Sequence, residues 1–201
     1  MKRWRAIPPA LVVVLGLIAF GCTQPPMRPG WVTLIDGERG LENFNQVGDA
    51  NWRAEGGAIV ADKGRGGSYL VSKNVYSDFE LKAEFWADDT TNSAIHMRAQ
   101  GPSDITDRNS YEANIFDRRP DPTYGTGGIV NFARVIGSPK AGGRWNTYEI
   151  TAKGPHIVVM LNGVRTAELT DGSFARGPIA LQYHENPGGA IKWRRLVIKP
   201  L

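Results

Sequence analysis

Short runs in which apolar and polar residues alternate recur along this chain and limit the folds open to it. The run Phe79–Trp86 is the clearest, because every second side chain from Phe79 to Phe85 is apolar and the residues between them are Glu or Lys. Successive side chains of a β-strand point to opposite faces, so this run predicts a strand with one buried and one solvated face. Gly, Pro, Asn and Asp separate the runs, which is typical of an all-β sandwich or barrel.

A hairpin is predicted near the carboxyl end. The runs Ile157–Leu161 and Val164–Leu169 flank Asn162-Gly163, a dipeptide that suits the type I′ turn. In the last predicted strand, the alternation of side chains points Trp193 toward the core. Other elements are expected at these positions: strands at Asn146–Ala152 and Ala190–Lys199, and at most one helical turn within Asp36–Phe44. We therefore predict an antiparallel β-sandwich with little helix.

The first twenty-one residues have the three parts of an export signal. Lys2, Arg3 and Arg5 precede the apolar run Leu11–Phe20, and a glycine comes before Cys22. This pattern predicts a signal peptide of the lipoprotein type, with Cys22 acylated and the protein anchored to the bacterial cell envelope, facing the periplasm or the exterior. The alternatives are an ordinary secretory signal and an uncleaved anchor.

Composition limits the remaining chain to one domain without a nucleic-acid partner. Residues 22–30 are proline-rich and are predicted to be a tether, and residues 31–201 have the length of a single domain. The net charge of the whole chain is +4, and loss of the three basic signal residues leaves it near +1, so the charge does not indicate nucleic-acid binding. The single cysteine excludes an intrachain disulfide.

Three predicted strands carry polar residues unlike those of an ordinary solvated face. They are Asn92–Arg98, Tyr111–Asp117 and Ile179–His184. If these strands are neighbours, one face gathers His96, Arg98, Glu112, Asn114, Gln182 and His184. Asp117 and Glu185 come at strand ends. Long connections, at Ala99–Ser110, Arg118–Gly128, Gly137–Arg144 and Glu185–Gly189, are expected to form the rim of this site.

The same segments resemble a known family. The similarity rests on ordered motifs that include Asn92–Arg98, Tyr111-Glu112, Thr126–Ile129, Gly177–His184 and Trp193-Arg194. Together they are similar to the 3-keto-disaccharide hydrolases, also called domain of unknown function 1080, over essentially all of the mature chain. The resemblance implies a jelly-roll sandwich of the concanavalin A type and cleavage of 3-keto-glycosides. Ala94 departs from the glycine usual in the family.

A 3-keto sugar changes what a glycosidase needs. Ordinary glycosidases use two carboxyl groups, whereas the predicted polar face holds one, Glu112. A ketone at C3 acidifies the hydrogen on C2, so the glycoside can leave by elimination and water can add back. We therefore expect Glu112 or His184 to carry the proton and Arg98 to bind the ketone oxygen. Residues predicted to bind substrate are His96, Asn114, Gln182, Asp117 and Glu185.

Several alternatives stay open. Arg98 and Glu112 could form a structural ion pair instead. A divalent metal bound by His96, Glu112 and His184 is another alternative, and the residues indicate no other cofactor. The protein could also be a non-catalytic carbohydrate-binding module or a structural envelope lipoprotein. For an enzyme of this kind, a sugar 3-dehydrogenase that makes the keto sugar is a candidate upstream partner. Contact with the membrane is expected only through the lipid.

The anchor can be tested at Cys22. Cys22→Ser removes the thiol to be acylated, so the protein should be released from the membrane fraction or remain an uncleaved precursor. Fractionation of cells, followed by mass measurement of the N-terminus, checks this. Wild-type protein that is wholly soluble in the cytoplasm would contradict the lipoprotein hypothesis.

Overall fold

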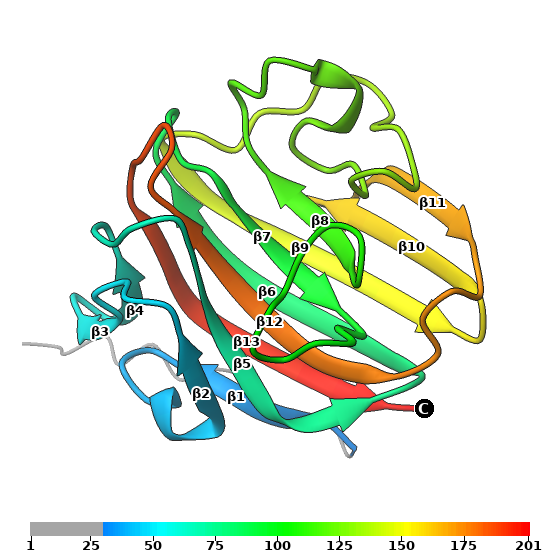
Figure 1. Cartoon of the computed structure of the whole chain (residues 1–201), viewed down its shortest axis with the longest axis horizontal. Helices are drawn as coiled ribbons and strands as arrows, with labels where there is room; N and C mark the ends of the chain where they lie inside the picture. Colours follow the sequence, from blue (N-terminus) through cyan, green and yellow to red (C-terminus); the bar gives the residue numbers. More distant parts are fainter. Residues whose placement is uncertain (1–29) are drawn as a thin grey trace, which may run out of the picture.

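Two antiparallel sheets face each other in the computed structural model, which describes residues 30–201 (Figure 1). The larger sheet has eight strands: in order β11 (Val164–Thr170), β10 (His156–Leu161), β9 (Arg144–Lys153), β6 (Phe79–Ala87), β13 (Ile191–Pro200), β4 (Ala58–Ala61) and β3 (Arg53–Glu55), with β1 (Val32–Asp36) paired to β13. The smaller sheet has the order β2 (Phe44–Val47), β5 (Gly67–Tyr76), β12 (Gly177–His184), β7 (Ser93–Met97) and β8 (Tyr111–Ile115). The two short 3-10 helices are η1 (Leu41–Asn43) and η2 (Pro122–Tyr124).

The core lies between the two sheets and follows the predicted alternation. In β6 the residues Phe79, Leu81, Ala83 and Phe85 are buried, as expected. The ring of Phe85 packs between Tyr148 and Trp193, at centroid distances of 5.1 and 5.6 Å. Trp193 is fully buried, so its predicted core position is confirmed.

The predicted hairpin is also confirmed. β10 and β11 pair directly and are joined by Asn162-Gly163, whose φ angles are 52° and 79°. Both values lie in the left-handed region that the type I′ turn requires, which asparagine and glycine tolerate better than other residues. The helical turn expected within residues 36–44 is η1, while η2 was not predicted.

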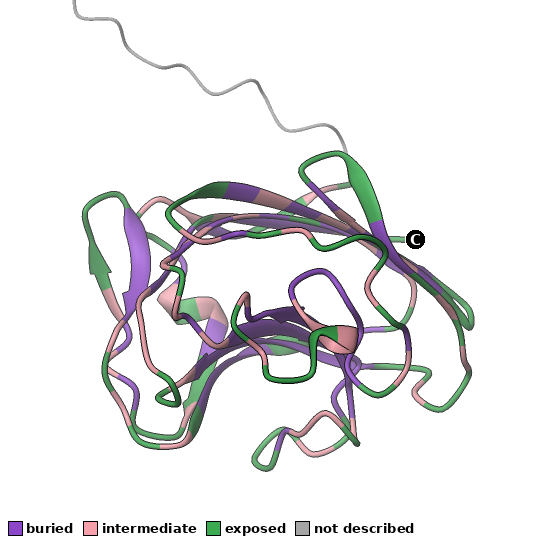
Figure 2. Cartoon of the chain, turned by 90° about the horizontal axis from the view of Figure 1, so that it is seen from above, coloured by how far each residue is buried: buried purple, intermediate pink, exposed green. Residues whose placement is uncertain are grey.

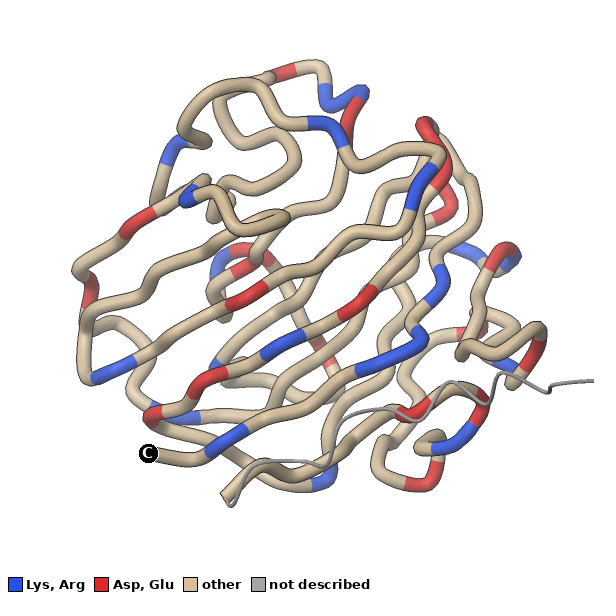
Figure 3. The backbone as a smooth tube through the Cα atoms, turned by 180° about the vertical axis from the view of Figure 1, so that it is seen from behind, with Lys and Arg blue, Asp and Glu red and all other residues tan. Residues whose placement is uncertain are grey.

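The outer faces of the two sheets differ. On the eight-stranded sheet, acidic and basic residues alternate along the strands (Figure 3) and pair across them, as in Lys82–Glu149 at 2.7 Å and Arg194–Glu84 at 2.6 Å. In the five-stranded sheet, β7, β8 and β12 are buried on both faces (Figure 2), because long connections cover their outer side. This covered face is the one that was expected to carry the site.

The connection Ala99–Ser110 crosses the covered face in front of β12 and β7 (Figure 1). Its Ile105 packs in a small apolar cluster with Val71, Ala180 and Tyr69, and the Tyr69 hydroxyl donates a hydrogen bond to the Ile105 carbonyl at 3.0 Å. The sheet thus has a second, shallow core on its outer side.

No helix within residues 30–201 has both the length and the apolar character that a membrane crossing requires. The predicted signal peptide, Cys22 and most of the tether fall outside the described residues.

The main core can be tested at Phe85. Phe85→Ala removes a ring packed on two aromatic neighbours, so the free energy of unfolding should fall by about 3–5 kcal/mol in denaturant titrations. Lys82→Ala, on the exposed face of the same strand, should change it by less than about 1 kcal/mol. Equal losses in the two variants would contradict the assigned faces.

Candidate functional site

Strand pairing brings the central polar residues together. His96 on β7 lies directly opposite Glu112 on β8 and opposite Ala180 on β12. In the adjacent row, Gln182 lies opposite Tyr69, and Ala94 lies opposite Asn114. We call the outer-face side chains Tyr69, His96, Glu112, Asn114 and Gln182 the polar face. Ala94, at the centre of this set, adds only a methyl group to the surface.

The polar face is almost closed to solvent. His96 and Asn114 are fully buried, while Tyr69, Glu112 and Gln182 keep 8%, 6% and 7% of their surface exposed. Burial of unpaired polar groups is costly, so such a face is expected to be satisfied by partners or to serve a ligand.

The His96 ring is held by the connection above it. Its Nδ1 lies 2.8 Å from the Ser110 hydroxyl oxygen, and the Tyr69 ring meets it edge-on at a centroid distance of 5.4 Å. Burial lowers the pKa of His96 from 6.5 to about 3, against a smaller opposing effect of the Gln182 side chain. The imidazole is therefore neutral at physiological pH and cannot act as a cation or as a general acid.

Glu112 is shifted the opposite way. Burial raises the pKa of its carboxyl from 4.5 to about 7, and the nearby charge of Asp107 adds to the rise while Arg119 opposes it. No hydrogen bond to this carboxyl group is formed within residues 30–201. A buried carboxyl group that titrates near neutral pH can both take and release a proton under physiological conditions.

Three further polar atoms on this face have no hydrogen-bond partner. His96 Nε2, Asn114 Oδ1 and Gln182 Oε1 are buried and have no hydrogen-bond partner in the described part of the chain. The orientation of Asn114 follows from its own bond, because its Nδ2 donates to the Tyr124 carbonyl at 2.5 Å. Together with the Glu112 carboxyl group, these atoms suit a ligand that presents several hydrogen-bond donors, such as the hydroxyl groups of a sugar.

Arg98 does not lie on the polar face, so the prediction that its side chain shares a face with His96 and Glu112 is wrong. It follows the last residue of β7 and has a φ of 52°, which turns its side chain out of the strand's alternation. The guanidinium donates to the carbonyls of Ser77 (2.8 Å), Gly154 (2.8 Å) and Phe174 (3.1 Å), and it pairs with Asp78 at 3.2 Å. The alternative ion pair of Arg98 with Glu112 is not formed either.

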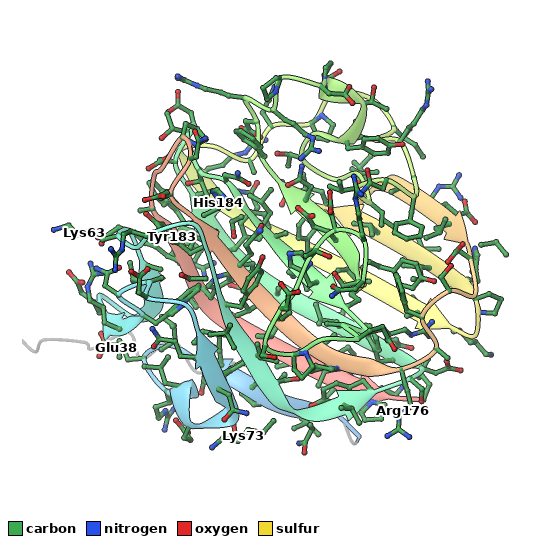
Figure 4. The ribbon with its side chains drawn as sticks, viewed as in Figure 1. Glu38, Lys63, Lys73, Arg176, Tyr183 and His184 are labelled. Carbon is green, nitrogen blue, oxygen red and sulfur yellow. The ribbon has the colours of Figure 1, made fainter. Side chains whose placement is uncertain are left out.

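His184 has the outer-face parity of Gln182 but lies too far away to work with Glu112. It sits half-buried at the end of β12 (Figure 4), where its Nδ1 accepts a hydrogen bond from the Asn186 backbone at 3.1 Å. Ala180, His96 and Glu112 lie in one row across the strands, and His184 is four residues beyond Ala180 along β12. His184 is therefore displaced from Glu112 by roughly 13 Å along the strands and, because two strand spacings separate β12 from β8, by roughly 10 Å across them. The two predicted proton carriers are therefore not brought together.

Asp117 and Glu185 organise loops. The Asp117 carboxylate accepts hydrogen bonds from the Thr126 hydroxyl at 2.6 Å and from the backbone of Ala141 and Gly142 at 2.9–3.0 Å. The exposed Glu185 accepts one from the backbone of Gly66 at 2.9 Å. Neither carboxylate joins the polar face, so their predicted contact with substrate there has no structural support.

The predicted metal alternative also lacks a gathered ligand set. Within residues 30–201, no three or more His, Cys, Asp or Glu side chains are grouped so as to hold a metal ion. His96, Glu112 and His184 are accordingly not such a group.

The residues that sequence reasoning missed come from elements it did not use. Tyr69 lies on β5, whose central residues are buried on both faces of the sheet. Consecutive apolar residues in the sequence, as in Tyr69–Val71, are a signal for such a strand. Ser110, Asp107 and Arg119 come from the long connections, where no periodicity indicates which side chain faces the sheet.

A surface hollow of about 420 Å³ lies elsewhere, on the outer side of the eight-stranded sheet near Asp36, Glu84 and Arg194. Its acidic groups already have partners: Asp36 pairs with Arg39, Glu84 pairs with Arg194, and Glu38 accepts a hydrogen bond from the Gly57 backbone at 2.9 Å. We therefore take the polar face, and not this hollow, as the candidate site.

Comparison with known proteins shows the family and the fold of this chain. Residues 30–199 match the family described as 3-keto-alpha-glucoside-1,2-lyase-like domain. A crystal structure from Parabacteroides distasonis ATCC 8503, provisionally assigned as a glycosyl hydrolase, is 26% identical, with a TM-score of 0.69 over 85% of this chain and 99% of that one. Comparison with curated protein sequences gives no match.

More distant structures share the fold. The carbohydrate-binding module CBM66 from Bacillus subtilis is 14% identical, with a TM-score of 0.55 over 85% of this chain and 95% of that one. A Bacillus subtilis protein of unknown function with a galectin-like fold is 10% identical, with a TM-score of 0.62 over 80% and 90%. The predicted lectin-type sandwich is thus confirmed, and the chain belongs to the family of 3-keto-alpha-glucoside-1,2-lyase-like domains.

Proposed function

We propose that this protein cleaves 3-keto-glycosides on its polar face, with Glu112 as the proton carrier. The observation that carries the proposal is the buried Glu112 carboxyl group, which lacks a partner within residues 30–201, has a pKa of about 7 and shares its face with unpaired acceptors. Membership of a carbohydrate-active family supports the substrate class.

The proposed reaction needs one carboxyl group. The Glu112 carboxylate removes the hydrogen from C2, which the C3 ketone acidifies, and the electron pair moves into the enolate. The enolate then expels the glycosidic oxygen from C1, and the newly protonated Glu112 returns its proton to that oxygen. Addition of water to the resulting unsaturated ketone completes net hydrolysis, so atoms and charge balance over the cycle.

The enolate requires positive charge near the ketone oxygen, and Arg98 is engaged elsewhere. We assign this part to Arg119, whose charge acts on Glu112 and whose buried Nε has no partner among the described residues. His96, Asn114 and Gln182 bind sugar hydroxyl groups through their free acceptor atoms in this proposal.

The cellular setting is proposed from the N-terminal sequence alone. A lipid on Cys22 would hold the enzyme in the cell envelope, where a sugar 3-dehydrogenase would supply the oxidised glycoside. Cys22 lies outside the described residues, so this part rests on the signal-like pattern of residues 1–22.

The same polar face could bind a sugar without cleaving it. The fold shared with a carbohydrate-binding module is the observation that favours this second candidate. It requires the acceptor atoms but no titrating carboxyl group, so activity measurements on Glu112 variants separate the two functions.

Stability should depend on pH through Glu112. Because its pKa is raised from 4.5 to about 7 in the folded state, the folded protein favours the neutral carboxyl group. The resulting stabilisation is complete below pH 4.5 and is lost as the pH rises through about 7. The free energy of unfolding of the wild type should therefore fall by about 3 kcal/mol from pH 4 to pH 8 relative to that of Glu112→Gln, which lacks the titrating group. Denaturant titrations at both pH values measure this, and a pH-independent difference would contradict the shifted pKa.

Cleavage should depend on the same group. Glu112→Gln removes the base, so turnover of a 3-keto-glycoside should fall by about two to four orders of magnitude. The wild-type kcat/KM should rise with pH through about 7, because the carboxylate is the active form. Release of the aglycone reports both quantities.

Glu149→Gln is the matched control, because Glu149 lies on the exposed face of the other sheet and should leave cleavage unchanged. Equal cleavage by the two variants would rule out Glu112 as the base. Binding of the keto-glycoside by the wild type without any cleavage would establish the binding-module function instead.

A further inference from the structure

Ser110 has a bonding pattern that fixes the hydrogen on the His96 ring. The Ser110 hydroxyl donates to the Thr106 carbonyl at 2.5 Å, and a carbonyl can only accept. The only hydrogen of the Ser110 hydroxyl is therefore engaged with Thr106. The Ser110 oxygen, which lies 2.8 Å from His96 Nδ1, must accept the hydrogen bond between the two side chains. The hydrogen between them must therefore reside on Nδ1.

A neutral imidazole carries one hydrogen, so Nε2 is left with a lone pair. Nε2 is buried on the polar face and has no partner within the described chain. Its neighbours by strand pairing are Glu112 on one side and Ala180 on the other. Ala180 offers no side-chain donor, and Glu112 is an acceptor when ionised. The Gln182 side chain also acts on the His96 ring, but it makes no hydrogen bond to Nε2, so the lone pair is available to a ligand hydroxyl group.

The connection that supplies Ser110 is itself well fixed. Asn109 braces it from within, because its side chain accepts from the Thr106 backbone at 2.9 Å and donates to the Asp104 carbonyl at 2.7 Å. Tyr69 anchors the same connection to the sheet through the Ile105 carbonyl. The Thr106 carbonyl is thereby held where the Ser110 hydroxyl can use it, before any ligand binds.

We infer that Ser110 is a positioning residue that keeps His96 in the Nδ1–H tautomer, so that His96 Nε2 accepts a hydrogen bond from a hydroxyl group of the substrate. The substrate part of this inference rests on the proposed function, whereas the tautomer follows from the bonds alone. A serine that only filled space beside the ring would leave the tautomer undetermined.

Nitrogen NMR of protein labelled at histidine tests the tautomer directly. The chain has three histidines, and His96 is the fully buried one, so its ring signals should remain those of a neutral imidazole when the pH is lowered to about 5. The wild type should show a hydrogen on Nδ1. Detection of the Nε2–H form in the wild type would overturn the inference without any variant.

Variants of Ser110 extend the test. Ser110→Ala removes the acceptor, so the Nε2–H form should appear, whereas Ser110→Thr keeps the hydroxyl and should retain Nδ1–H. Ser103→Ala, an exposed serine of the same connection, is the matched control and should leave the His96 signals unchanged. A Ser110→Ala protein that folds and keeps the wild-type tautomer would contradict the positioning role.

Kinetics then test the substrate contact. Ser110→Ala should raise KM by about tenfold, the loss of one neutral hydrogen bond, with a smaller effect on kcat, and Ser110→Thr should restore it. In a series of deoxy 3-keto-glycosides, one member should lack the hydroxyl group that contacts His96 Nε2. The wild type and Ser110→Ala should bind that member equally, because neither can form this hydrogen bond with it. If no member behaves so, Nε2 does not contact a hydroxyl group. Failure of the wild type to cleave any keto-glycoside would refute the proposed function but leave the NMR result standing.

Discussion

Burial of β7, β8 and β12 on both faces of the five-stranded sheet is the constraint on which the candidate site depends. A sheet in a sandwich needs only one apolar face, and the eight-stranded sheet follows that rule with charged pairs on its outer side. The five-stranded sheet instead has its outer side covered by the connection Ala99–Ser110, anchored through Ile105. Polar side chains on that side therefore lose water without gaining a full set of partners.

This loss of water explains the electrostatics of the site. The same desolvation moves two neighbouring groups in opposite directions, because it favours the neutral form of each: the pKa of Glu112 rises to about 7 and that of His96 falls to about 3. Arg98 shows the contrasting solution. It is equally buried, but three carbonyl groups and Asp78 satisfy it, which marks it as a structural residue rather than a group available to substrate.

Strand parity predicted part of the site well. His96, Glu112, Asn114 and Gln182 share one face because the side-chain period of a strand is two and their strands are adjacent. Parity failed for Arg98, since the regular strand ends one residue before it. For His184, parity gave the correct face of the sheet but not the position along the strand, so it could not show that His184 lies far from Glu112.

The sequence by itself determined the fold class, the Asn162-Gly163 hairpin and the inward side of β6 and β13, because these depend on local alternation and turn chemistry. Its ordered motifs also indicated the family. Only the tertiary structure decided which long connection covers the sheet, that Ser110 meets His96, and that Arg98 turns away. These contacts join residues whose relative positions no local period sets, and the burial that shifts the pKa values of Glu112 and His96 arises only when those connections fold over the face.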